Sequence, residues 1–115
     1  MTVTIYHNPR CSKSRQTLAL LEERGVSPRI VDYLKTPPSA AELSTILKML
    51  GLRPRDLMRE GEPRYAELGL KDRDLDDEAL IALMVANPIL IERPSVVSGG
   101  KAALGRPPET VLKIL

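Results

Sequence analysis

A strand–helix–strand pattern at the start of the chain constrains the fold more than any other feature. Residues 2–6 read TVTIY, a β-branched run that predicts a buried strand. HNPR interrupts the run, and a helical pattern of leucines then extends from Ser12 to a stop at Gly25. PRIVDYL predicts a second strand. Because a helix joins the two strands, they should lie parallel in one sheet.

Helical signals follow through the middle of the chain. Ser39 with Glu42 is typical of a capping box, and Gly51 is placed to end the helix that this box begins. We expect a short helical piece around Pro54–Met58, followed by an irregular acidic stretch over residues 59–74.

The last part of the chain predicts a helix, a hairpin and a closing helix. DDEALIALMVAN should be capped at Asp76, SVV and KAAL should pair across Gly99-Gly100, and PPETVLKIL has proline in its first turn. The order is a βαβ unit, a helical insertion over about 36–91 and a ββα unit. It describes an α/β, thioredoxin-like fold, three-layer with a mixed sheet, and we expect one domain over residues 1–115.

The composition indicates an aliphatic core and gives no sign of binding to a nucleic acid or a membrane. Hydrophobic residues make up 43% of the chain and aromatic residues only 3%, without Phe or Trp. The net charge of +2 gives no reason to expect an anionic polymer or an anionic membrane as partner. Basic residues gather at both ends and acidic residues in the middle, so the ends would form a basic site if they met.

We expect a cytoplasmic, monomeric protein with a reduced thiol. No signal-peptide pattern is visible, and the longest apolar run, Leu80–Ala86, is too short to cross a bilayer. One cysteine cannot form an internal disulfide.

The single cysteine, Cys11, follows the single histidine, His7, in the loop that leads into the first predicted helix. Backbone N–H groups and the helix dipole favour an anion there, and a thiolate is such an anion. An unperturbed thiol has a pKa of about 8.5 and is mostly protonated at neutral pH. Ser14 is placed to hydrogen-bond the sulfur. Cationic neighbours should lower the thiol pKa further: Arg10, Lys13, Arg15 and, when charged, His7.

Other interpretations of these residues stay open. A lone cysteine is commonly a small buried hydrophobe, although the polar neighbours of Cys11 favour a reactive thiol. His7 equally fits a strand-end histidine that hydrogen-bonds to backbone. One Cys and one His are too few ligands for a zinc site, so we expect no metal. A cysteine-phosphatase C-x5-R loop is disfavoured, because Thr17 stands where its arginine would be.

A single reactive thiol needs a second thiol to complete a redox cycle. Ser14 stands where a C-x-x-C motif would place its second cysteine. The resolving thiol should therefore come from outside the chain, from glutathione or from a small dithiol protein.

The whole chain resembles the glutaredoxin-dependent arsenate reductases (ArsC family), and within them the chromosomal homologues. The motifs that carry the resemblance are TIYHNPRCSKSRQTL, YLKTPPSAAEL, YAELGL, NPILIERPSVV and RPPETVLKIL, in this order. The resemblance implies a thioredoxin-like fold with a helical insertion. It implies attack of a cysteine on arsenate, attack of glutathione on the thiol–arsenate adduct, and resolution of the mixed disulfide by glutaredoxin. Glutathione is then a cosubstrate, and no bound cofactor is implied.

By motif position, the resemblance makes Cys11 the nucleophile and His7 the residue that helps to lower its pKa. The implied oxyanion-binding arginines are Arg59, Arg93 and Arg106. Arginine suits this role because it binds tetrahedral oxyanions bidentately and keeps its charge, although each of the three also fits a solvated surface charge. Pro94, just before SVV, takes the place of the cis-proline beside the active cysteine of the thioredoxin architecture.

One departure from the family pattern concerns the substrate. This chain reads CSKS at the thiol, where the arsenate reductases of the family carry CGTS, and the added lysine makes the site more basic. Two alternatives therefore remain: a glutathione-dependent reductase of another substrate, and a regulatory binding protein of the Spx type. Spx-type proteins more often carry C-x-x-C, which this chain lacks.

Overall fold

The computed structural model describes residues 3–91, 95–105 and 107–115. The chain forms two units, which are described one at a time: Met1–Thr36 with Arg93–Leu115, and Pro37–Glu92. The second unit covers the predicted helical insertion. The predicted single domain over residues 1–115 stays a prediction.

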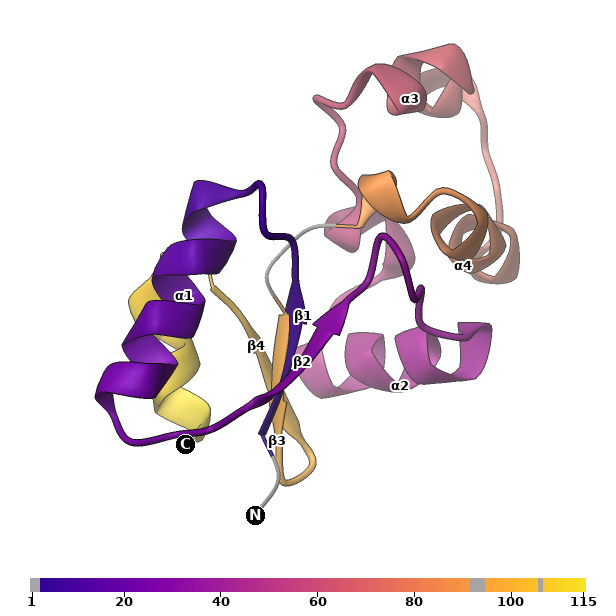
Figure 1. Cartoon of the computed structure of the whole chain (residues 1–115). Helices are drawn as coiled ribbons and strands as arrows, with labels where there is room; N and C mark the ends of the chain where they lie inside the picture. The colour runs from indigo at the N-terminus through magenta and orange to yellow at the C-terminus, as the bar shows by residue number, and fades with distance from the viewer. Residues whose placement is uncertain (1–2, 92–94, 106) are drawn as a thin grey trace. The chain divides into compact units, whose positions relative to one another are not determined.

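The first unit contains a mixed four-stranded sheet (Figure 1). Its strands are β1 (Val3–His7), β2 (Arg29–Asp32), β3 (Ser95–Ser98) and β4 (Lys101–Leu104), in the order β2-β1-β3-β4. β1 pairs in parallel with β2 and antiparallel with β3, and β3 pairs antiparallel with β4. The predicted βαβ unit, hairpin and mixed sheet are confirmed, and with them the thioredoxin-like fold.

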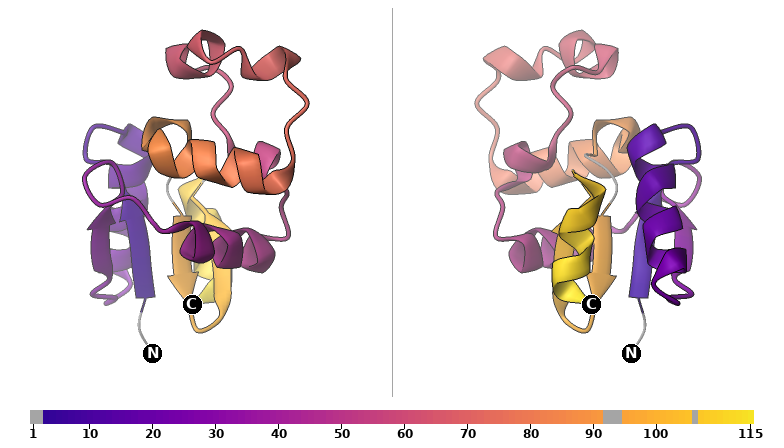
Figure 2. Two further views of the ribbon diagram at one scale, coloured as in Figure 1. Left: turned by 90° about the vertical axis from the view of Figure 1, so that its right-hand side faces the viewer. Right: turned by 90° about the vertical axis from the view of Figure 1, so that its left-hand side faces the viewer.

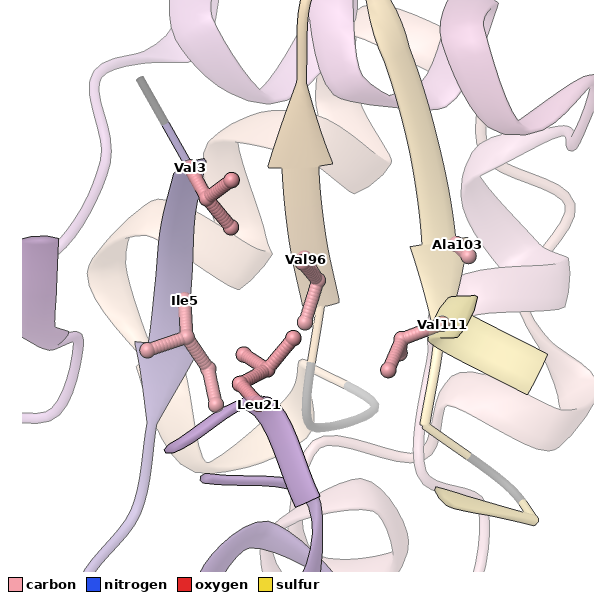
Figure 3. Close-up of a cluster of buried hydrophobic side chains, with 6 residues drawn as sticks. All are labelled: Val3, Ile5, Leu21, Val96, Ala103 and Val111. Carbon is pink, nitrogen blue, oxygen red and sulfur yellow. The ribbon is translucent and has the colours of Figure 1, made fainter. Parts of the chain in front are cut away.

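Two helices cover one face of this sheet. α1 (Ser12–Glu23) and the 3-10 helix η4 (Pro108–Ile114) lie side by side on that face (Figures 1 and 2). Between them and the strands lies a cluster of aliphatic side chains (Figure 3): Val3, Ile5, Leu21, Val96, Ala103 and Val111. This cluster contains no aromatic residue. Tyr33 and Tyr65 are buried elsewhere in the protein, so the prediction of an entirely aliphatic core is wrong. Because side chains alternate along a strand, His7 points to the same face of β1 as Val3 and Ile5.

The closing helix differs in kind from a regular α-helix. It is a 3-10 helix, in which the Thr110 N–H donates to the Pro107 carbonyl oxygen, three residues back, at 3.0 Å. The segment is only seven residues long and begins with Pro108, which, like the N-cap residue Pro107 before it, has no N–H to donate. The tighter 3-10 form is common in short helical pieces.

The second unit is helical. Its elements are α2 (Ala40–Leu50), η1 (Pro54–Leu57), α3 (Pro63–Glu67), η2 (Leu70–Asp72), α4 (Asp77–Ala86) and η3 (Pro88–Leu90). Ser39 Oγ accepts from the Glu42 N–H at 3.1 Å, so the predicted capping box is confirmed. Gly51 ends α2 at a φ of 69°, a left-handed conformation that favours glycine. Asp76 caps α4 as predicted, accepting from the Ala79 N–H at 2.8 Å.

The prediction of an irregular stretch over residues 59–74 is wrong, because α3 and η2 form there. The guanidinium of Arg55 holds this region together. Its Nη1 donates to the Tyr65 hydroxyl and to the Leu70 carbonyl, each at 3.0 Å, and its Nη2 donates to the Arg73 carbonyl at 2.9 Å. Arg55 lies outside residues 59–74, so the periodicity within this stretch does not predict the two short helices.

Candidate active site

A tight turn between β1 and α1 carries the thiol. The Cys11 N–H donates to the Asn8 carbonyl oxygen at 3.0 Å. The Arg10 N–H donates to Asn8 Oδ1, also at 3.0 Å. Asn8 is buried, and it therefore closes the turn through both its backbone and its side chain.

Cys11 is the N-cap residue of α1 and is partly exposed. Its backbone is extended (φ −95°, ψ 123°), and its carbonyl oxygen accepts the first helical hydrogen bond, from the Arg15 N–H at 3.0 Å. An N-cap side chain lies beside the N–H groups of the first helical turn, where the dipole favours negative charge. Arg15 Nη1 donates to the Pro9 carbonyl oxygen at 2.8 Å, which fixes a cation against the turn. The turn thus combines an accessible thiol with a positive local potential.

A buried hydrogen bond links the end of β1 to the first turn of α1. His7 Nδ1 and Ser14 Oγ lie 2.5 Å apart, and Ser14 Oγ also accepts from the Asn8 N–H at 3.0 Å. Both side chains are buried, and Ser14 has no exposed surface. Ser14 is therefore unsuited to attack a dissolved substrate, and it instead connects His7 to the turn that holds Cys11.

The environment of His7 favours the neutral imidazole. Burial lowers the pKa of His7 below 6.5, the charge of Arg15 lowers that pKa further, and the charge of Asp32 raises it. His7 is therefore uncharged at neutral pH and adds no full positive charge beside the thiol. The expected cations Arg10, Lys13 and Arg15 are all exposed.

Arg59 lies in the helical unit, where its backbone and side chain are both held. Its N–H donates to the Leu90 carbonyl oxygen at 2.7 Å, next to a β-bridge between Met58 and Ile91. Its guanidinium forms an ion pair with Glu62, and the two side chains are only 25% and 20% exposed. The other residues predicted for oxyanion binding and for the cis-proline lie outside the described residues: Arg93, Arg106 and Pro94.

The structure adds three residues to the candidate site that the sequence analysis did not select. Asn8 could have been found from the Asn-Pro turn signal of residues 8–9. Asp32 lies within the predicted strand PRIVDYL, and only the register of the sheet shows that it pairs with His7. Glu62, three residues after Arg59, has the spacing of a helical ion pair, but it precedes α3, and its contact depends on the local turn.

Metal ligands and membrane spans were sought among the described residues. Within residues 3–91, 95–105 and 107–115, no three His, Cys, Asp or Glu side chains gather closely enough to hold a metal ion. In the same part of the chain, none of the helices combines the length and apolar composition needed to cross a membrane.

The chain is similar to several known proteins over nearly its full length. A protein of Escherichia coli K12 with the name "Uncharacterized protein YfgD" is 60% identical over 114 residues, covering 98% of this chain and 96% of its own. An arsenate reductase of Haemophilus influenzae is 50% identical over 116 residues and is covered completely, as is this chain.

The solved structures and the family model agree with these relatives. The structure of an arsenate reductase from Vibrio cholerae is 55% identical, has a TM-score of 0.96, and is matched over 98% of its length and 100% of this chain. The model of the ArsC family matches residues 6–114, a range that includes the thiol turn, the strands β2 to β4 and the helical unit. The chain therefore belongs to the ArsC family.

Proposed function

We propose that this protein is an arsenate reductase in which Cys11 is the nucleophile. The observation that carries the proposal is the position of Cys11, the one thiol of the chain, at the N-cap of α1 beside the buried His7–Ser14 pair. Its family membership and its relatives with this activity point the same way.

The proposed reaction begins with the thiolate of Cys11. The sulfur attacks the As(V) centre of arsenate, an arsenic–oxygen bond breaks, and water leaves from a protonated oxygen. Glutathione then attacks the adduct. An S–S bond forms between glutathione and Cys11 as the bond between Cys11 sulfur and arsenic breaks. The electron pair of that bond stays on arsenic, As(V) becomes As(III), and arsenite is released.

The second half of the cycle needs a thiol from outside the chain. A mixed disulfide between Cys11 and glutathione has no second cysteine of this chain to attack it. We propose that glutaredoxin attacks the glutathione sulfur and returns Cys11 to the thiolate. The partial exposure of Cys11 supports access by a partner protein.

Three guanidinium groups are proposed to hold the oxyanion: Arg59, Arg93 and Arg106. Arginine suits arsenate because its planar fork gives two parallel N–H donors and its charge does not titrate near neutral pH. In the described structure, Arg59 faces a carboxylate of its own chain, Glu62, so an oxyanion would have to compete with this ion pair. Pro94 remains the proposed cis-proline.

A coupled assay tests the proposal. The purified protein is given arsenate, glutathione, glutaredoxin, glutathione reductase and NADPH, and NADPH oxidation and arsenite are both measured. We expect turnover that requires each thiol component and is abolished by Cys11→Ser. The matched control is Ser12→Ala, which alters an exposed neighbour of the thiol and should retain activity.

Different failures of this assay point to different alternatives. Full activity of Cys11→Ser would refute the assigned nucleophile. Absence of arsenite with the wild-type protein, together with glutathione-dependent turnover of another oxidised compound, would indicate a reductase of that compound. A stable complex with RNA polymerase and no turnover would indicate a regulatory protein of the Spx type.

A further inference from the structure

We propose that Asp32 is a positioning residue for the active site: paired in register with buried His7, it acts on the imidazole and, through the contact of His7 with Ser14, sets the pH range over which Cys11 reacts. The statement about Cys11 rests on the proposed function, whereas the statement about His7 does not. Asp32 lies outside every motif that carries the family resemblance. It immediately precedes one of them, YLKTPPSAAEL.

The sheet places Asp32 beside His7. β1 and β2 run in parallel, and His7 pairs in register with Asp32 as the last residue of each strand. Paired residues of neighbouring strands lie on the same face of a sheet, about 4.8 Å apart in the hydrogen-bonding direction. Both side chains therefore stand on the face that α1 covers, at the edge where Cys11 begins the helix.

Asp32 is anchored at this point by its own turn. Its Oδ1 accepts from the Leu34 N–H at 3.2 Å. Its carbonyl oxygen accepts from the N–H groups of Lys35 at 3.1 Å and Thr36 at 2.8 Å. One backbone hydrogen bond thus holds the carboxylate, and two more hold the main chain of Asp32 at the end of β2.

Opposing influences act on His7. Burial disfavours the imidazolium, and the charge of Arg15, from α1, acts in the same direction. Asp32, from β2, is the charge that favours the imidazolium. Ser14, also from α1, is uncharged and contacts the ring at Nδ1. Among these groups, Asp32 is therefore the one that counteracts the effect of burial on the pKa of His7.

The proton on His7 decides the direction of the hydrogen bond to Ser14. In a neutral ring with its proton on Nε2, the Ser14 hydroxyl donates to Nδ1. In the imidazolium both nitrogens carry protons, so Nδ1–H must donate to Ser14 Oγ, and the hydroxyl proton must point elsewhere. Ser14 Oγ also accepts from Asn8, which closes the turn of Cys11. Protonation of His7 is thereby transmitted to the groups that surround the thiol.

Titration of the one histidine by NMR tests the first half of the inference. Since the chain has a single histidine, its imidazole gives a single assignable titration curve. Asp32→Asn keeps the Oδ1 acceptor for the Leu34 N–H but removes the charge, and it should shift the His7 curve to lower pH. Arg15→Gln should shift the curve to higher pH. Glu22→Gln is the matched control, because Glu22 lies eight residues beyond Ser14, about 12 Å along α1, and should leave the curve in place.

Alkylation of Cys11 by iodoacetamide across the same pH range tests the second half. In Asp32→Asn, the rate profile should shift in the same direction as the His7 curve, while Glu22→Gln should reproduce the wild-type profile. An unshifted His7 curve in Asp32→Asn, or a shifted His7 curve with an unchanged alkylation profile, overturns the inference. Neither result bears on arsenate turnover, and failure of the wild-type protein to reduce arsenate would leave both titrations interpretable.

Discussion

The backbone N–H of Arg59 donates to the carbonyl oxygen of Leu90 at 2.7 Å, beside the bridge between Met58 and Ile91. This bond ties the segment of one proposed oxyanion-binding arginine to the segment that leads, three residues later in the sequence, to Arg93. The helical unit thus supports Arg59 through its main chain, while Glu62 engages the guanidinium. The ion pair yields the first prediction.

Glu62→Gln should tighten oxyanion binding several-fold. The carboxylate of Glu62 neutralises Arg59 and repels an anion, and a partly exposed ion pair of this kind is worth up to about 1 kcal/mol, or roughly fivefold in affinity. Inhibition of the reductase by sulfate measures the effect. Glu67→Gln is the control, because Glu67 forms the same type of pair with Arg64 at an exposed position. Weaker inhibition in Glu62→Gln would show instead that Glu62 orients Arg59 for binding.

Ser14→Ala should destabilise the protein by about 1–3 kcal/mol, because it leaves the buried Asn8 N–H and His7 Nδ1 without their hydrogen-bond partner, the Ser14 hydroxyl. Urea unfolding monitored by circular dichroism measures this loss. Ser12→Ala removes a hydroxyl from an exposed position on the same turn and should change the free energy of unfolding by less than about 0.5 kcal/mol. Equal effects of the two substitutions would contradict the structural role of the Ser14 hydroxyl.

Acid should destabilise the protein through His7. Because the pKa of His7 is lowered by burial on folding, the unfolded chain binds the proton at higher pH than the folded chain does. The contribution of His7 is therefore complete above about pH 6.5 and is lost as the pH falls below that value, at no more than about 1.4 kcal/mol per pH unit. Urea unfolding at a series of pH values measures the slope. His7→Gln should flatten it above the range where carboxylates titrate, and an unchanged slope would exclude His7 as its source.

Leu21→Ala should cost about 2–5 kcal/mol, because Leu21 is fully buried between α1 and the sheet and its truncation leaves a cavity. Leu20→Ala, at a partly exposed position on the same helix, should cost clearly less. Thermal or urea unfolding of the two variants provides the comparison. If Leu20→Ala were the more damaging substitution, the assigned inner face of α1 would be wrong.

The sequence by itself determined the features that depend on neighbouring residues. The β-branched run of β1, the capping box of Ser39 with Glu42 and the left-handed Gly51 are local preferences of the backbone. The capping box and Gly51 appear where they were predicted, and β1 extends one residue beyond the predicted run, to His7. The position of Cys11 at the start of α1 follows for the same reason, because Asn8-Pro9 is a turn signal immediately before a helical pattern.

Only the tertiary structure decided which distant groups meet. α3 and η2 depend on Arg55, whose guanidinium reaches hydrogen-bond acceptors 10 to 18 residues away. The pairing of His7 with Asp32 depends on the register of two parallel strands. Because a helix connects these strands, the sequence does not determine their register. Local preferences are set by the rotation of adjacent bonds, whereas register and ion pairing are set by burial and charge across segments that the chain must first bring together.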